Sequence, residues 1–140
     1  MVFSVPRAIG HEWKDDPTIR GTEILLRRIP KTWVRLDSNG NLRITSAAFK
    51  DRELSILIAS VMSASGRQPR DAISGYLGYG LVSITAADAR SLNQLVARDP
   101  TPDEAAHEVV VGPKHTNKRR VARKLRDLAQ WIVKPQVPYI

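Results

Sequence analysis

The 140-residue chain contains no cysteine. That absence excludes disulfide bonds, thiolate metal sites and a cysteine nucleophile. Long apolar runs are missing too, because no stretch reaches the roughly 18 residues that a membrane-spanning helix needs. The first residues, Met1 to Pro6, lack the charged region and the long apolar region of a secretory signal. These absences predict a cytoplasmic protein without a membrane partner.

Cofactor and metal signatures are also absent from the sequence. Gly75, Gly78 and Gly80 follow a Gly-x-x-Gly-x-Gly spacing, which is neither a phosphate-binding loop nor a dinucleotide fingerprint. Acidic residues beside histidine occur as scattered pairs, such as His107-Glu108. None has the i, i+4 spacing that directs two ligands at one ion. We therefore predict no cofactor and no metal.

The chain does contain enough apolar residues to form the core of one domain. Hydrophobic residues make up 42% of it, which is not the composition of a disordered protein. Residues 1–22 are interrupted by proline and glycine and are predicted to form an N-terminal arm, which Trp13 would pin to the body. Residues 23–140 are predicted to form a single α+β domain.

Several short segments favour β-strands with an early hairpin. Val34-Arg35-Leu36 and Leu42-Arg43-Ile44 flank a turn that contains Asn39-Gly40, and both turn residues tolerate the positive φ that hairpin turns need. The other predicted strands are rich in Ile, Leu and Val: residues 24–29, 54–59, 81–84, 95–97 and 107–111. We expect a mixed or antiparallel sheet, with short helices between the strands.

Three helical or flexible segments complete the prediction. Thr85 and Asp88 have capping-box spacing, which favours a short helix from residue 86. Small residues over 60–66 predict a flexible connection. Over residues 117–133, Val121, Leu125, Leu128 and Ile132 recur at spacings of 4, 3 and 4, which predicts a C-terminal amphipathic helix.

Positive charge is concentrated in that last segment. Between Lys114 and Arg126 the chain has seven Lys or Arg and no acidic residue, whereas its other residues carry fifteen basic and fourteen acidic side chains. The net charge of +8 and the pI of about 10.3 thus arise from one short stretch. Such a stretch favours nucleic acid, DNA or RNA, or another polyanion bound mainly through phosphate contacts. The predicted contact residues are Lys114, Lys118, Arg119, Arg120, Arg123 and Arg126.

Base recognition has little support in the sequence, because none of its eight aromatic residues falls within the basic run. Only Tyr76 and Tyr79, on the glycine loop, have a setting suited to stacking on a base. We therefore expect binding with weak sequence preference and a steep dependence on salt.

Two other functions fit the same sequence. His107, at the start of a predicted strand, could act as the acid–base group of a metal-independent ribonuclease of the toxin type, with Arg43, Lys114 and His115 nearby. Alternatively, the protein is a non-catalytic subunit of a larger complex. Its basic helix would then meet an acidic protein surface, and the N-terminal arm or the apolar tail Val137 to Ile140 would fasten it to a partner protein.

Overall fold

A six-stranded antiparallel sheet organises the protein. The computed structural model describes residues 4–6, 12–112 and 116–135. The strand order in the sheet is β10-β7-β3-β6-β9-β8, and every neighbouring pair is antiparallel. The strands are β3 (Ile24–Ile29), β6 (Glu53–Ile58), β7 (Gly80–Thr85), β8 (Leu95–Arg98), β9 (His107–Val111) and β10 (Gln130–Val133). The predicted α+β class with an antiparallel sheet is confirmed.

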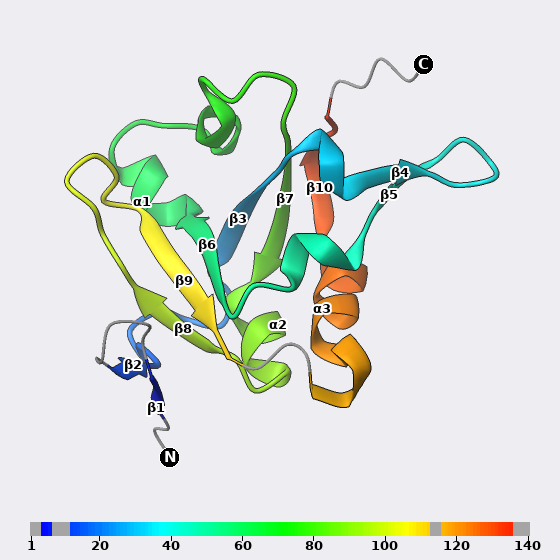
Figure 1. Cartoon of the computed structure of the whole chain (residues 1–140). Coiled ribbons are helices and arrows are strands. Elements are labelled where there is room, and N and C mark those ends of the chain that lie inside the picture. Colours follow the sequence, from blue (N-terminus) through cyan, green and yellow to red (C-terminus); the bar gives the residue numbers. More distant parts are fainter. Residues whose placement is uncertain (1–3, 7–11, 113–115, 136–140) are drawn as a thin grey trace.

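Two further strand pairs lie outside this sheet. The predicted hairpin consists of β4 (Val34–Leu36) and β5 (Leu42–Ile44), paired as Val34–Ile44, Arg35–Arg43 and Leu36–Leu42. It projects from the body in Figure 1. In the arm, β1 (Ser4–Pro6) pairs with β2 (Glu12–Lys14). The hairpin prediction is confirmed.

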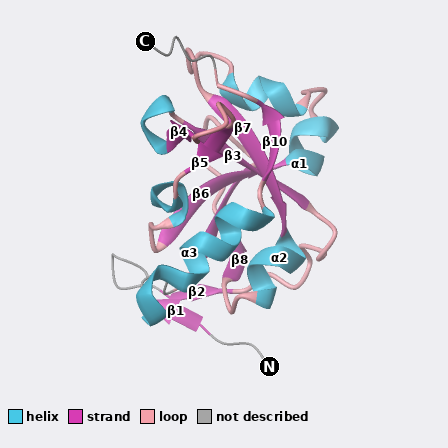
Figure 2. Cartoon of the chain, turned by 90° about the vertical axis from the view of Figure 1, so that its right-hand side faces the viewer, coloured by secondary structure: helices cyan, strands magenta, loops and turns pink. Residues whose placement is uncertain are grey.

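One face of the sheet is covered by helices α2 (Ala86–Ser91) and α3 (Thr116–Leu128), as Figure 2 shows. The main core lies between them and the sheet. It contains Leu25, Leu54, Ile56 and Val110 from the strands and Ala122 and Leu125 from α3. Phe49, from the 3-10 turn η2 (Ser46–Phe49), fills the same core and is fully buried. Strand side chains alternate between faces, so the other strand residues point to the second face.

The second face is covered at its two ends by different segments. At one end, Trp13 of β2 packs on Leu95, Val109 and Val111. At the other end, Leu26 and Leu57 are covered by α1 (Ala59–Ala64) and the 3-10 turn η3 (Pro69–Ile73). In Figure 1, α1 lies beside the start of β9, and the β1–β2 pair lies below β8. Ser55 and His107 lie on this second face of the sheet, between the two covered regions.

Two predictions about the elements are wrong. Residues 60–66 were expected to be flexible, but Ala59–Ala64 is helical because Met62 is buried against the sheet. The C-terminal helix was expected to reach residue 133, yet α3 ends at Leu128 and Gln130–Val133 is a strand paired with β7. The exposed edge of β7 supplies backbone partners that a longer helix would leave unused. Leu128 and Ile132, expected in the buried stripe, are 41% and 46% exposed.

No helix within the described residues is long and apolar enough to span a bilayer. In the same residues, no cluster of three or more histidine and carboxylate side chains is arranged to hold a metal ion. The apolar tail proposed as a partner contact, residues 137–140, lies outside the described part of the chain.

Candidate nucleic-acid interface

Helix α3 presents a basic face away from the sheet. Ala122 and Leu125 are buried in the core, and Val121 packs beside them. Among the predicted contact residues, Arg120 and Arg123 are exposed and Arg126 is half-buried; Lys124 is exposed as well. Lys114 and the side chains of Lys118 and Arg119 lie outside the described part of the structure. The described residues thus include four cationic side chains along this helix.

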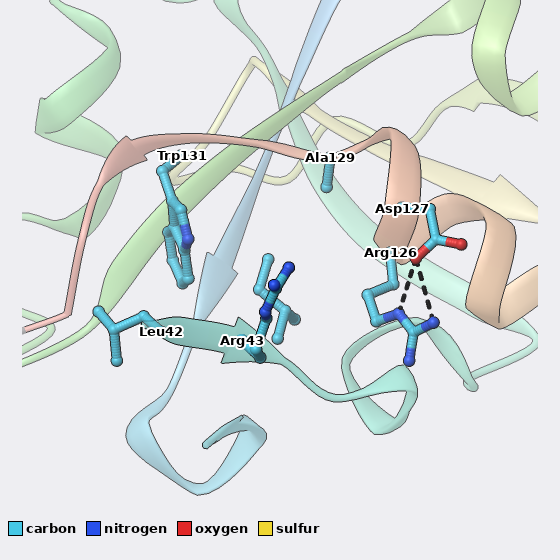
Figure 3. Close-up of a pocket in the computed structure, with 7 residues that line it drawn as sticks. Leu42, Arg43, Arg126, Asp127, Ala129 and Trp131 are labelled. Carbon is cyan, nitrogen blue, oxygen red and sulfur yellow. Dashed lines mark hydrogen bonds and ion pairs between the residues drawn. The ribbon is translucent and has the colours of Figure 1, made fainter. Parts of the chain in front are cut away.

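The C-terminal end of α3 borders a pocket of about 520 Å³. Helix α3 contributes Arg126 and Asp127, and Ala129 follows in the turn to β10. The other walls are the hairpin strand β5 and Trp131 of β10. Figure 3 shows the Arg43 side chain between Trp131 and the Arg126–Asp127 pair. The pocket is lined by Leu42, Arg43, Ile44, Arg126, Asp127, Ala129 and Trp131.

The hairpin adds positive charge to the entrance of this pocket. Arg35 and Arg43 are directly opposite each other across the β4–β5 pair, and both side chains are exposed. Like charges in this position destabilise a strand pair.

Two carboxylates offset part of this charge. The Nε of Arg43 is 2.9 Å from Oδ2 of Asp37, and the Nη2 of Arg126 is 3.1 Å from Oδ1 of Asp127. Hydrogen bonds from the Asn41 backbone and from Arg43 lower the pKa of Asp37, so this carboxylate stays ionised. Both pairs are at the surface, where such ion pairs contribute little free energy and leave guanidinium N–H groups for a ligand.

The acidic residues around position 104 do not neutralise the helix. Glu104 forms a bidentate pair with Arg67, with both N–O distances 2.6 Å. Glu108 lies beside Arg98, with the Arg98 Nε 3.7 Å from Oε2. Neither carboxylate is paired with a described α3 arginine. The basic face is therefore not cancelled internally by these groups.

Trp131 gives the pocket an aromatic wall. Its ring packs partly on the core and partly lines the pocket. Sequence reasoning missed this role, because Trp131 was assigned to the helix rather than to a strand facing the hairpin. Tyr76 and Tyr79, the predicted stacking pair, lie elsewhere and contact each other edge-to-face with centroids 5.2 Å apart. The face of Tyr76 is occupied by Arg28, whose Cζ is 4.1 Å from the ring centroid.

His107 does not join the basic helix. It lies on the second face of the sheet, where its Nε2 is 3.1 Å from the Ser55 hydroxyl. It lines a different pocket, together with Arg27 and Arg28, and Arg43 is not part of that pocket. The expectation that Arg43 would lie near His107 is wrong. Lys114 and His115, the other expected neighbours, are outside the described residues.

Comparison with protein-family models, with curated proteins and with solved structures gives no match for this chain.

Proposed function

We propose that this protein binds nucleic acid in the pocket between the β4–β5 hairpin and the end of α3. The observation that carries the proposal is the convergence of Arg43 and Arg126, from segments 83 residues apart, on one pocket with Trp131. Arginine forms bidentate hydrogen bonds with phosphate oxygens. An aromatic face accepts a stacked base whatever its identity. Guanidinium groups beside an indole thus favour a single strand over a regular duplex, whose bases are not available for stacking.

The remaining basic residues would extend this contact in two directions. Arg120, Arg123 and Lys124 continue the positive surface along α3, and Arg35 continues it along the hairpin. These side chains would track the phosphate backbone without reading sequence. Binding should therefore depend steeply on salt and weakly on base composition.

The test is fluorescence anisotropy with labelled 15-nucleotide single strands of RNA and DNA, over a series of salt concentrations. For single strands, the slope of log K against log salt changes by about 0.7 for each phosphate contact. The double variant Arg43→Ala/Arg126→Ala should therefore bind more weakly, and its slope should be about 1.4 shallower.

A matched control removes the same charge elsewhere. Arg20 and Arg70 are exposed, belong to neither the hairpin nor α3, and do not line the pocket. The double variant Arg20→Ala/Arg70→Ala should keep the slope of the wild type and most of its affinity. An equal loss in both double variants would show that net charge alone drives binding, and the proposed pocket would then be wrong.

Poly-glutamate separates nucleic acid from an acidic protein surface, the alternative partner. It offers carboxylates but no base to stack on Trp131. At equal charge and equal salt, we expect the single strand to bind more tightly than poly-glutamate. Equal affinity for the two polymers would contradict the nucleic-acid proposal.

A further inference from the structure

Ser55 and His107 meet because of the register between β6 and β9. Ser55 is opposite Val109, and His107 is opposite Leu57. His107 and Val109 are two residues apart, so their side chains share a face, and Ser55 and His107 are diagonal neighbours on it. The distance between His107 Nε2 and Ser55 Oγ is 3.1 Å.

The other ring nitrogen of His107 is held by Asp99. Its Nδ1 is 2.8 Å from the Asp99 carbonyl oxygen and 3.3 Å from the carboxylate Oδ2. Both atoms are acceptors, so Nδ1 carries the proton and Nε2 is left to accept the hydrogen of the Ser55 hydroxyl. The Asp99 backbone N–H also donates to the His107 carbonyl at 3.1 Å, which fixes the two residues against each other. A serine, a histidine and an acidic residue are therefore connected in the order required for nucleophilic catalysis.

A pocket of about 160 Å³ lies beside this trio, and both Ser55 and His107 line it. It sits where β3 and β6 separate: the two strands pair at Leu25–Ile58 and Leu26–Leu57 and not beyond. The Arg27 side chain occupies the separation, with Nη1 2.9 Å from the Ser55 carbonyl and Nε 2.7 Å from the Ala48 carbonyl. These hydrogen bonds hold the strands apart. Arg27 is only 6% exposed, and a buried charged side chain is costly unless its N–H groups are hydrogen-bonded.

The pocket also has a positively charged wall. Burial lowers the pKa of Arg27 to about 10, so its guanidinium remains charged at neutral pH. Arg28 lines the same pocket and is half-buried; its Nε donates to the Ala72 carbonyl. Positive charge close to a reacting carbonyl stabilises the oxyanion that forms during acyl transfer.

We propose that Ser55, His107 and Asp99 form a second functional site, which hydrolyses small carboxylic esters. The Ser55 oxygen attacks the ester carbonyl carbon while its proton passes to Nε2 of His107. The C–O bond to the leaving group then breaks, and the departing alkoxide takes that proton. A water molecule attacks the acyl-serine through the same histidine, which releases the carboxylic acid and restores Ser55. Asp99 acts as a positioning residue, because it touches His107 and not the ester.

The location of the site favours a small ester over a polynucleotide. Ser55 and His107 lie on the face of the sheet opposite α3, so a strand bound at the basic helix does not reach them. A volume of about 160 Å³ suits a short acyl group. RNA cleavage by general acid–base chemistry would also require a second proton-transfer group, and the other titratable groups lining this pocket are two arginines and Tyr79.

A fluorophosphonate probe tests the nucleophile directly in the full chain, with the modified residue found by mass spectrometry. We expect covalent labelling at Ser55, abolished in Ser55→Ala and reduced at least a hundredfold in rate in His107→Gln. Ser60→Ala is the matched control, since Ser60 is also an exposed serine but has no histidine partner among its described contacts. Labelling of Ser55 no faster than of Ser60 would overturn the proposal.

Turnover is measured with 4-nitrophenyl acetate. Ser55→Ala should lose the hydrolysis seen with the wild type while keeping its melting temperature and nucleic-acid affinity, because Ser55 is exposed and far from α3. Asp99→Ala should lower kcat with KM unchanged, and by less than His107→Gln, because the backbone carbonyl that holds Nδ1 remains. Hydrolysis unaffected by Ser55→Ala would refute the assignment. Cleavage of labelled RNA that depends on His107, in the absence of any ester cleavage, would also refute the assignment.

Discussion

The change Glu108→Gln should stabilise the protein at neutral and alkaline pH. Glu108 is fully buried, opposite Ile56 on β6 and Arg98 on β8. Among the described residues, neither carboxyl oxygen has a hydrogen-bond partner, and the Arg98 Nε lies 3.7 Å from Oε2. Burial disfavours the charged carboxylate and raises the pKa of Glu108 to about 8, although Arg98 partly opposes this. The side chain is thus protonated in the folded protein at neutral pH.

The magnitude follows from the difference between the folded and unfolded pKa values. Below pH 4.5 the side chain is protonated in both states, and its contribution to stability is complete. Between pH 4.5 and about 8 only the unfolded state releases the proton, so the free energy of unfolding falls by about 1.4 kcal/mol for each pH unit. The total loss is on the order of 5 kcal/mol, which is comparable to the whole stability of many domains. Glutamine carries no charge at any pH and removes this dependence.

Urea denaturation followed by tryptophan fluorescence, from pH 5 to pH 8.5, measures the effect. The difference in unfolding free energy between Glu108→Gln and the wild type should grow steadily with pH. With a slope near 2 kcal/mol/M, the midpoints at pH 8 should differ by about 2 M urea or more. The control Asp103→Asn removes an exposed carboxylate and should give a nearly constant difference. Parallel curves for Glu108→Gln and the wild type would show that Glu108 is ionised in the fold, and the reasoning would be wrong.

Three further substitutions test the packing, a helix cap and an ion pair. Phe49→Ala removes a fully buried ring from the main core and should cost about 3–5 kcal/mol in urea denaturation, whereas a cost below 1 kcal/mol would place that ring outside the core. Thr85→Ala removes the hydroxyl that accepts from the Asp88 N–H at 3.0 Å and should lower the free energy of unfolding by about 1 kcal/mol. Thr85→Ser keeps a hydroxyl and should leave that free energy unchanged. Arg67→Gln removes the bidentate partner of Glu104, whose pKa is lowered mainly by that hydrogen bond. Stability from this pair is present at neutral pH and is lost as the pH falls through the lowered pKa of Glu104. The gap between the variant and the wild type at pH 7 should therefore close in acid; an unchanged gap in acid would contradict the pairing.

The elements that depend on local chemistry were predictable from the sequence. The Asn39-Gly40 turn between two β-rich segments produced the β4–β5 hairpin, in which Gly40 adopts the positive φ of 78° that the turn needs. The spacing of Thr85 and Asp88 produced a capping box at the start of α2. The apolar segments became the strands of an antiparallel sheet.

Periodicity failed at the end of the chain for a physical reason. The spacing of Leu125, Leu128 and Ile132 matches a helical stripe, but Gln130–Val133 gains backbone partners on the free edge of β7. A local sequence pattern cannot indicate that the edge of β7, whose residues Leu81 and Ser83 pair with Val133 and Gln130, is available for pairing. The place of Trp131 in the pocket could not be predicted either. A side chain on a strand points at different neighbours from one on a helix, and Trp131 was expected on the helix.

The position of the positive charge can be read from the residues alone, since seven Lys or Arg lie between Lys114 and Arg126. The neighbours of that charge depend on how the chain folds. Folding placed Arg43 across a pocket from Arg126, and it placed His107 on the opposite face beside Ser55. The reason is that strand order and register are set by long-range pairing of backbone groups, and these pairings bring together residues that no short pattern connects.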